Sequence, residues 1–236
     1  MPTTTLDTIT IPLTGETVSL ELPPRLQALR EAALAAQRMP QPPAPETAVI
    51  SRLQVAYELA DARAWAAHTD EEDWQIWRAR RCAGRLAVMP FDLEPGELLP
   101  GKPSFRAIPC EDEAALAEAR SVLATMPPFP GGDSGHFHPD YEKLLRVGVR
   151  GLLHEIGERS RRPGLTEEQG HFYTACRIVM QALSEFVVRC ADECAAMADA
   201  DPEGAQDWRE VAAACRHIAT EPPRTFREAL QLMFLA

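Results

Sequence analysis

The sequence predicts a mainly α-helical protein with a few short strands. Apolar residues recur at spacings of three and four through most of the chain, which is typical of helices that bury one face. Serine or threonine followed three residues later by glutamate or glutamine marks several helix starts, and proline- and glycine-rich stretches separate the helical segments. With 236 residues, of which 45% are hydrophobic and 25% charged, the chain can bury a sizeable core.

Two regions are expected along the chain. Residues 1–22 form an N-terminal extension in which apolar residues alternate on either side of Gly15, and this alternation predicts a short hairpin. Residues 23–236 form the helical part. Its first helix begins near Pro24, and the prolines within residues 40–45 predict a stiff, extended connector after that helix.

The following segments alternate between helix and irregular chain. A helical apolar spacing begins at Val49, and a second helix is expected to begin with a Thr69–Glu72 capping box. Residues 90–109 hold five prolines and are therefore irregular or short strand. The acidic run at residues 111–113 suits the positive end of a further helix, and residues 126–139 form a second loop rich in proline and glycine.

Beyond this loop the pattern is strongly helical. Asp140 stands at a predicted helix start, and Gly148 and Gly151 remove side chains from one face of that helix, which predicts the close approach of another backbone. A Thr166–Gln169 capping box begins the next helix. Its expected buried stripe consists of Phe172, Cys176, Val179, Leu183, Phe186, Cys190, Cys194 and Met197.

Two more helices complete the expected fold. Asp201 and Pro202 are predicted to cap and start the first of them. Its buried side is expected to carry Trp208, Val211, Cys215 and Ile218. A Thr225–Glu228 capping box opens the second, which runs through apolar residues to Ala236. Because this run has no glycine, proline or basic stop signal, we expect the sequence to be truncated within a domain.

Charge and composition exclude several classes of function. The net charge of -11 and a pI near 5.1 argue against a nucleic-acid or anionic-membrane partner, whose phosphates require Lys and Arg. No apolar stretch approaches the roughly 20 residues that span a bilayer, and no signal peptide is recognisable, so we expect a cytoplasmic protein. The six cysteines (Cys82, Cys110, Cys176, Cys190, Cys194 and Cys215) are expected to be reduced core thiols rather than a disulfide framework.

Three segments, taken in order, carry a resemblance to a known family. They are FDLEPGELLPGKPSF (residues 91–105), GHFHPDYEKLLRVGVRGLLHEI (residues 135–156) and PPRTFREALQLMF (residues 222–234). Together they are similar to the N-terminal region of the pyruvate formate-lyase-like glycyl radical enzymes, over about residues 24–236. Pro100 and Met233 depart from the family pattern, which usually has a small apolar residue and an aromatic residue there.

The resemblance implies a fold and a reaction. It implies the helical N-terminal part of a glycyl-radical-type α/β barrel, belonging to a lyase or dehydratase that cleaves a C–C or C–X bond of a small polar substrate. The full enzyme would be a homodimer, would need a radical-SAM activating enzyme, and would hold no tightly bound cofactor. By the same resemblance, the thiyl cysteine and the glycyl radical loop lie beyond Ala236. This chain would then contain no catalytic residue and would be inactive alone.

One residue is expected to contact substrate. His136, in the Gly135–Pro139 segment, resembles the family histidine that faces the barrel pocket when the substrate is hydroxylated. The alternative is that His136 only hydrogen-bonds its own loop. The stretch RVGVRG (residues 146–151) superficially resembles a glycyl radical loop, but its glycine comes one place early and it is expected to lie within a helix.

A metal site is not expected. Cys190 and Cys194 are four residues apart, with Cys215 and His217 on the next helix, so four potential zinc ligands are within reach of one another. However, Cys190 and Cys194 continue an apolar stripe, and free cysteine is among the most buried residue types. Cys215 and His217 are two positions apart on a helix and face different ways.

Two other classes of protein stay open at this point. One is a separately encoded helical subunit, or a degenerate relative, that binds a partner protein without catalysis and has a closed core. The other is an unrelated helical binding module, in which His136 would lie away from any pocket. The truncated-enzyme interpretation differs from both, because it predicts exposed apolar surface on the last helices.

Overall fold

The structure is a computed structural model. It describes residues 6–10, 17–21, 23, 26–28, 30–31, 50–94, 97, 99–104, 107–108, 113–127 and 139–236. The chain divides into two compact units, Met1–Ala48 and Val49–Ala236. In the first unit, strand β1 (Leu6–Thr10) pairs antiparallel with strand β2 (Thr17–Glu21), with Leu6 opposite Glu21. This pairing lies where the sequence predicted a hairpin. The division between the units lies beyond the proposed boundary at residue 22, and that boundary stays a prediction.

The second unit is built from helices and one short strand pair. Strand β3 (Ile50–Ser51) pairs antiparallel with strand β4 (Ala107–Ile108). The helices are α2 (Arg52–Ala66), α3 (Trp74–Val88), α4 (Glu113–Leu123), α5 (Tyr141–Ser160), α6 (Glu167–Ala200), α7 (Ala205–Ile218) and α8 (Phe226–Leu235). The predicted fold class, mainly α with a few short strands, is confirmed.

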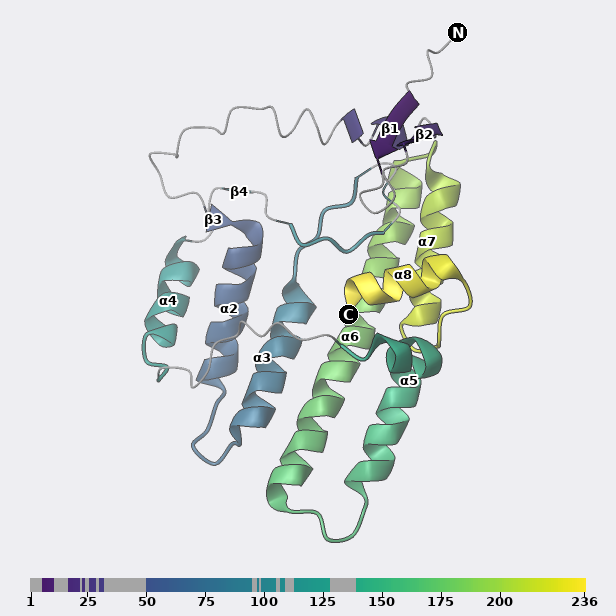
Figure 1. The fold of residues 1–236 in the computed structure, drawn as a ribbon. Helices are drawn as coiled ribbons and strands as arrows, with labels where there is room; N and C mark the ends of the chain where they lie inside the picture. The colour runs from purple at the N-terminus through teal and green to yellow at the C-terminus, as the bar shows by residue number, and fades with distance from the viewer. Residues whose placement is uncertain are drawn as a thin grey trace. The chain divides into compact units, whose positions relative to one another are not determined.

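Helix α6 organises this unit. Its 34 residues span roughly 50 Å, and α3 and α5 pack along it. Figure 1 shows α6 running between α3 and α5, with α7 beside its C-terminal half and α8 crossing that half. Helix α2 packs against α3 on one side and α4 on the other. The longest helix therefore contacts both the early and the late part of the unit.

Local capping signals explain several of the helix starts. Ser51 accepts a hydrogen bond from the Gln54 backbone N–H, and the Asp140 carboxylate accepts one from the Lys143 N–H at 3.0 Å. The predicted Thr166–Gln169 capping box is confirmed, with its two reciprocal hydrogen bonds at 3.2 and 3.1 Å. Each of these caps needs only residues within one helical turn.

The predicted start of α3 is wrong. Its N-cap is Asp73, whose carboxylate accepts from the Gln75 N–H at 2.8 Å, and not Thr69. Asp73 directly precedes the helix, where its short side chain reaches the first free N–H groups. The carboxylate of Glu72 instead pairs with His68, at 3.1 Å, and with Arg80.

Two later starts also differ from the prediction. Helix α7 begins at Ala205, because Asp201 holds a turn in which one carboxylate oxygen accepts from the Gly204 N–H and the other from the Trp208 indole. At α8 the Thr225 hydroxyl accepts from the Glu228 N–H as expected. The Glu228 carboxylate, however, bonds the Arg224 N–H at 2.6 Å, one residue before the position that a capping box requires.

Helix α5 is broken at Gly148, where the sequence predicted a continuous helix. Gly148 has φ 64° and ψ 179°, a conformation that L-residues with a Cβ rarely adopt. A Cβ at Gly148 would lie 2.6 Å from the backbone of Glu221 and Pro222, so the predicted approach of another backbone is confirmed here. At Gly151 that prediction is wrong, because the crowding neighbour is the side chain of Val147, from the same element.

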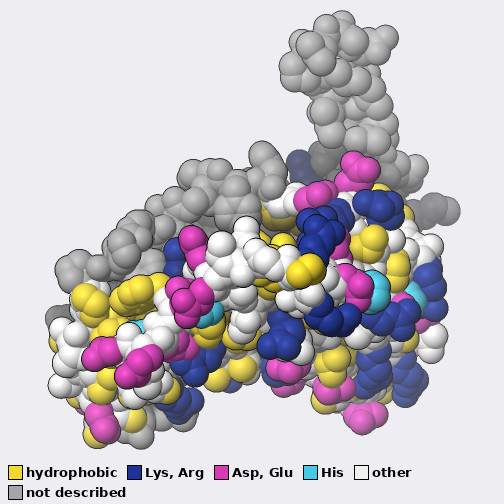
Figure 2. All heavy atoms as spheres, turned by 90° about the horizontal axis from the view of Figure 1, so that it is seen from below, with side chains coloured by type: hydrophobic (Ala, Val, Ile, Leu, Met, Phe, Trp, Pro, Cys, Tyr) yellow, Lys and Arg dark blue, Asp and Glu magenta, His cyan; other side chains and the backbone are white. Residues whose placement is uncertain are grey.

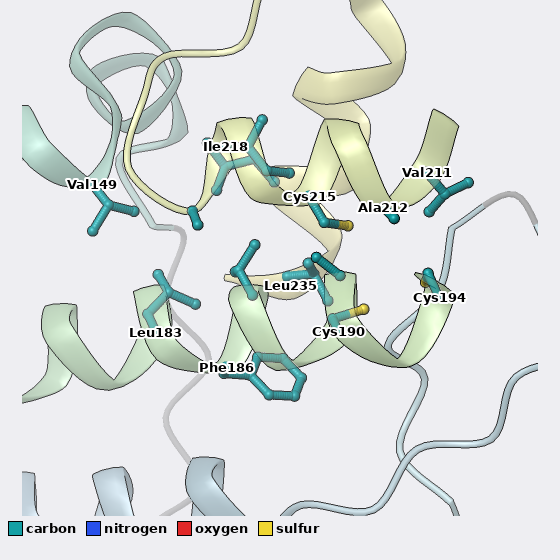
Figure 3. Packing of buried hydrophobic residues seen from close by; sticks show 14 of the residues in the cluster. Val149, Leu183, Phe186, Cys190, Cys194, Val211, Ala212, Cys215, Ile218 and Leu235 are labelled. Carbon is teal, nitrogen blue, oxygen red and sulfur yellow. The ribbon is translucent and has the colours of Figure 1, made fainter. Parts of the chain in front are cut away.

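The core of the unit lies where α6, α7 and α8 meet. Figure 3 shows Cys190 and Cys194 on the side of α6 that faces α7, with Leu235 of α8 between the two helices, whereas the Phe186 ring points away from α7. The predicted buried side of α7 is confirmed, since its members are at most 2% exposed. The predicted stripe on α6 is buried from Leu183 to Cys194, whereas Met197 is only partly buried and Phe172 is 52% exposed.

Candidate functional site

The predicted substrate contact, His136, lies outside the described residues. The description resumes at Pro139, and Asp140 then caps the first turn of α5. The role of His136 in a pocket therefore stays a prediction. The described residues do include the contacts that hold the three family-like segments together.

The segments at residues 135–156 and 222–234 meet at Gly148. Next to the break in α5, the Arg150 N–H donates to the Thr220 carbonyl at 2.8 Å, and the Arg150 guanidinium pairs with the Glu221 carboxylate at 2.6 Å. A ring nitrogen of His217 lies 2.9 Å from the Pro222 carbonyl oxygen. The loop between α7 and α8 is thus fastened to the middle of α5.

The third segment, residues 91–105, joins the same assembly through α8. The Gln231 side-chain amide donates to the Pro100 carbonyl at 2.9 Å, and both residues are fully buried. Gly101 has φ 109°, and a Cβ there would overlap the side chain of Leu235. Because all three segments converge on α8, most of their matching residues define a scaffold rather than a reaction centre.

The buried thiols lie at the centre of this scaffold. Cys190, Cys194 and Cys215 are 0% exposed, and their sulfur atoms face the space between α6 and α7 (Figure 3). A hydrogen bond with Cys190 and burial both raise the pKa of the Cys194 thiol. A neutral, inaccessible thiol is neither a nucleophile nor a metal ligand. Among the described residues, no group of three His, Cys, Asp or Glu side chains is placed to hold a metal ion.

Sequence reasoning missed a buried ion cluster between α2 and α3. Asp61 is 7% exposed and accepts hydrogen bonds from Arg81 at 2.8 Å and Arg85 at 2.6 Å. Burial alone would raise the pKa of Asp61, but the two guanidinium groups outweigh it and hold the pKa below its usual value. The i, i+4 spacing of Arg81 and Arg85 indicates that both guanidinium groups lie on one face of α3. The sequence does not show that α2 presents Asp61 to that face.

Sequence reasoning also missed a groove at the N-terminal half of α6. Its floor includes Phe172, Cys176 and Val179, and one wall is formed by Leu152 and Ile156 of α5. The groove has a volume of about 480 Å³ and is lined mainly by apolar side chains.

Charged side chains of both signs are interspersed on the face shown in Figure 2, which does not resemble the single-sign surface that nucleic acids require. None of the described helices has the length and apolar composition needed to cross a membrane.

Comparison with known proteins identifies the class. Residues 104–236 match the family described as pyruvate formate lyase-like, and the chain belongs to that family. It is 31% identical over 109 residues to (2S)-3-sulfopropanediol dehydratase of Klebsiella oxytoca, covering 44% of this chain and 13% of that protein. It is 33% identical over 129 residues to the probable dehydratase YbiW of Escherichia coli strain K12, covering 52% of this chain and 16% of that protein.

Solved structures show the same fold at lower identity. The glycerol-bound form of the B12-independent glycerol dehydratase from Clostridium butyricum matches with a TM-score of 0.64 and 18% identity, covering 76% of this chain and 30% of that one. A glycyl radical enzyme from Archaeoglobus fulgidus matches with a TM-score of 0.59 and 20% identity, covering 78% and 32%. The chain thus has the fold of a helical portion of a glycyl radical enzyme, and it spans only 13–16% of the curated relatives it matches.

Proposed function

We propose that this chain is the N-terminal helical layer of a cytoplasmic glycyl radical dehydratase that removes a leaving group from a small hydroxylated substrate. Family membership supports the enzyme class, and the two curated relatives described above are dehydratases. We favour dehydration over acyl cleavage for that reason. The full-length enzyme would act as a homodimer after activation by a radical-SAM partner, without a tightly bound cofactor.

The observation that carries this proposal is an exposed apolar stripe on α8. Phe226, Leu230 and Phe234 follow one another at four-residue spacing and are 79%, 38% and 48% exposed. The opposite side of the same helix is buried against Pro100 and the α6 core. A helix with apolar residues on both sides is typical of one that lies between two layers, so the stripe fits a chain that belongs to a larger folded protein.

The residues of this chain would frame the pocket rather than perform the radical step. In the full enzyme, a thiyl radical would abstract a hydrogen atom from the substrate, which would then lose its leaving group. The buried Cys190, Cys194 and Cys215 do not suit that role, since no substrate could reach a fully buried sulfur. His136 would hydrogen-bond a substrate hydroxyl, with Asp140 and the α5 break fixing the helix that follows it.

The first test is to establish the native product and assay it. We expect a native protein much larger than 26 kDa that shows a glycyl radical signal after anaerobic activation and dehydrates a vicinal diol. His136→Ala should raise KM for the diol about tenfold or more, as loss of a hydrogen bond to substrate implies, with little effect on stability. His138→Ala is the matched control. A native 26 kDa product would contradict the proposed full-length enzyme. Equal KM values for the two variants would contradict the role of His136 in substrate binding.

A non-catalytic role is the alternative. A separately encoded helical subunit, or a degenerate relative, is favoured by the fully buried core around Cys190, Cys215 and Ile218, which closes without further chain. Such a protein would be a stable 26 kDa product that binds a partner and shows no radical signal. The unrelated helical module is excluded, because the family match covers residues 104–236.

A further inference from the structure

Helix α6 carries one apolar stripe with two different surroundings. In its C-terminal half, Leu183, Phe186 and Cys190 are buried beneath neighbouring helices. In its N-terminal half the same spacing continues through Phe172 and Cys176, but there Phe172 is 52% exposed and Cys176 is only half-buried. A continuous stripe of this kind is expected to be covered along its whole length.

The uncovered half forms the floor of the groove between α3 and α5. Ala79 of α3 lines one wall, and Leu152 and Ile156 of α5 line the other. The volume of about 480 Å³ far exceeds the roughly 30 Å³ that one water molecule occupies in the liquid, so the groove has room for several side chains. Apolar surface recessed between two helical walls is the form of site that an amphipathic helix enters.

We propose that a helix from the rest of a full-length pyruvate formate lyase-like polypeptide fills this groove within the same chain. This inference rests on the proposed function. The helix would carry apolar side chains at i, i+3 or i+4, and i+7 toward α6. It would turn a polar flank toward Gln75 and Arg78, which line the α3 side.

Two observations favour this occupant. The chain spans 13–16% of its curated relatives and 30% of the glycerol dehydratase structure, so proteins of this family have ample further chain to supply the helix. A second copy of the chain would have to fill the groove from a separate molecule. Filling from the same polypeptide also avoids the translational and rotational entropy cost of association.

Cys176 allows a direct test, because it lies in the groove. Both the 236-residue protein and the full-length protein would be treated anaerobically with N-ethylmaleimide, and modification of each cysteine would be followed by peptide mass spectrometry. We expect Cys176 to react at least tenfold more slowly in the full-length protein. The exposed Cys82 is the reference thiol, and Cys190 and Cys194 should stay unmodified in both proteins as long as the fold is intact.

A pair of variants gives a second measurement. Phe172→Glu should leave the Tm of the 236-residue protein nearly unchanged and lower that of the full-length protein by several degrees. Val188→Glu is the matched control, since Val188 is 41% exposed on the same helix and does not line the groove. The control should not produce this difference between the two proteins.

Two results would overturn the inference. One is equal modification of Cys176 in the two proteins, and the other is protection of Cys176 in the 236-residue protein that increases with its concentration, which would assign the groove to a second copy. Dehydratase activity of the same full-length preparation separates the two proposals. Activity with an accessible Cys176 refutes only the inference, whereas a protected Cys176 without activity refutes only the proposed reaction.

Discussion

Gly148 lies so close to Pro222 that a Cβ atom on Gly148 would be 2.6 Å from the Pro222 backbone nitrogen. These two residues belong to two of the three family-like segments, which are separated by α6 and α7 in the chain. Their contact fixes the direction of the first half of α5, which follows Pro139. The requirement for glycine is therefore twofold: a positive φ and a lack of space for any side chain.

Gly148→Ala is expected to destabilise the 236-residue protein by about 2–4 kcal/mol, because a strained conformation and a backbone clash are added together. Urea unfolding followed by circular dichroism measures the change. Gly84→Ala is the control, since Gly84 lies within α3 and a Cβ there would have no neighbour within 4 Å. The control should gain about 0.5–1 kcal/mol. Equal stability of the two variants would contradict the role assigned to Gly148.

Asp61→Asn is expected to cost about 2–4 kcal/mol, since it removes the charged partner that Arg81 and Arg85 share in a largely buried site. Glu58→Gln is the control, because Glu58 pairs with a half-exposed Arg120 and should cost less than about 1 kcal/mol. Thermal unfolding of the three proteins at pH 7 gives the comparison. A cost for Asp61→Asn no larger than that for Glu58→Gln would show that the cluster is not stabilising.

The same carboxylate predicts a dependence on pH. The pKa of Asp61 is lower in the folded protein than in the unfolded chain, where it is about 3.9. Its contribution is therefore fully present above the unfolded pKa and is lost as the pH falls through the folded pKa. We expect the stability difference between wild type and Asp61→Asn to shrink below about pH 4. A difference that stays constant from pH 7 to pH 3 would contradict this assignment.

The core thiols are expected to be unreactive in the native protein. Hydrogen bonding to Cys190 and burial raise the pKa of Cys194, so little thiolate forms near neutral pH. At pH 8, iodoacetamide should modify the exposed Cys82 slowly, because partial desolvation raises the pKa of that thiol as well, and should leave Cys194 unmodified until urea unfolds the protein. Mass spectrometry of the native and unfolded samples provides the measurement. Rapid native modification of Cys194 would show that the core opens readily.

The stripe on α8 is expected to make the 236-residue protein self-associate. Phe226→Lys together with Phe234→Lys should reduce association at high protein concentration, because both side chains are mainly exposed apolar surface. Their effect on unfolding free energy should stay within about 0.5 kcal/mol, as is usual for surface positions. Light scattering after size-exclusion chromatography measures the association. Unchanged association in the double variant would mean that the contact lies elsewhere.

Features that depend on one helical turn were predicted well from the sequence. The caps at Asp140 and Thr166 are examples, because a short polar side chain and nearby free N–H groups are enough to form them. At α3 the same reasoning chose Thr69 over Asp73, since several acceptors compete before that helix and spacing alone does not rank them. His136 was named from family resemblance, and the described residues leave that role as a prediction.

The sequence by itself determined the helical class, the order of the helices, the buried side of α7 and the family to which the chain belongs. Only the tertiary structure decided that α5 breaks at Gly148, that Asp61 joins Arg81 and Arg85, and that Phe172 stays exposed. The physical reason is the separation along the sequence over which the two kinds of interaction act. Periodicity shows that a side chain can be buried, whereas the elements packed around it, often far away in the sequence, decide whether it is.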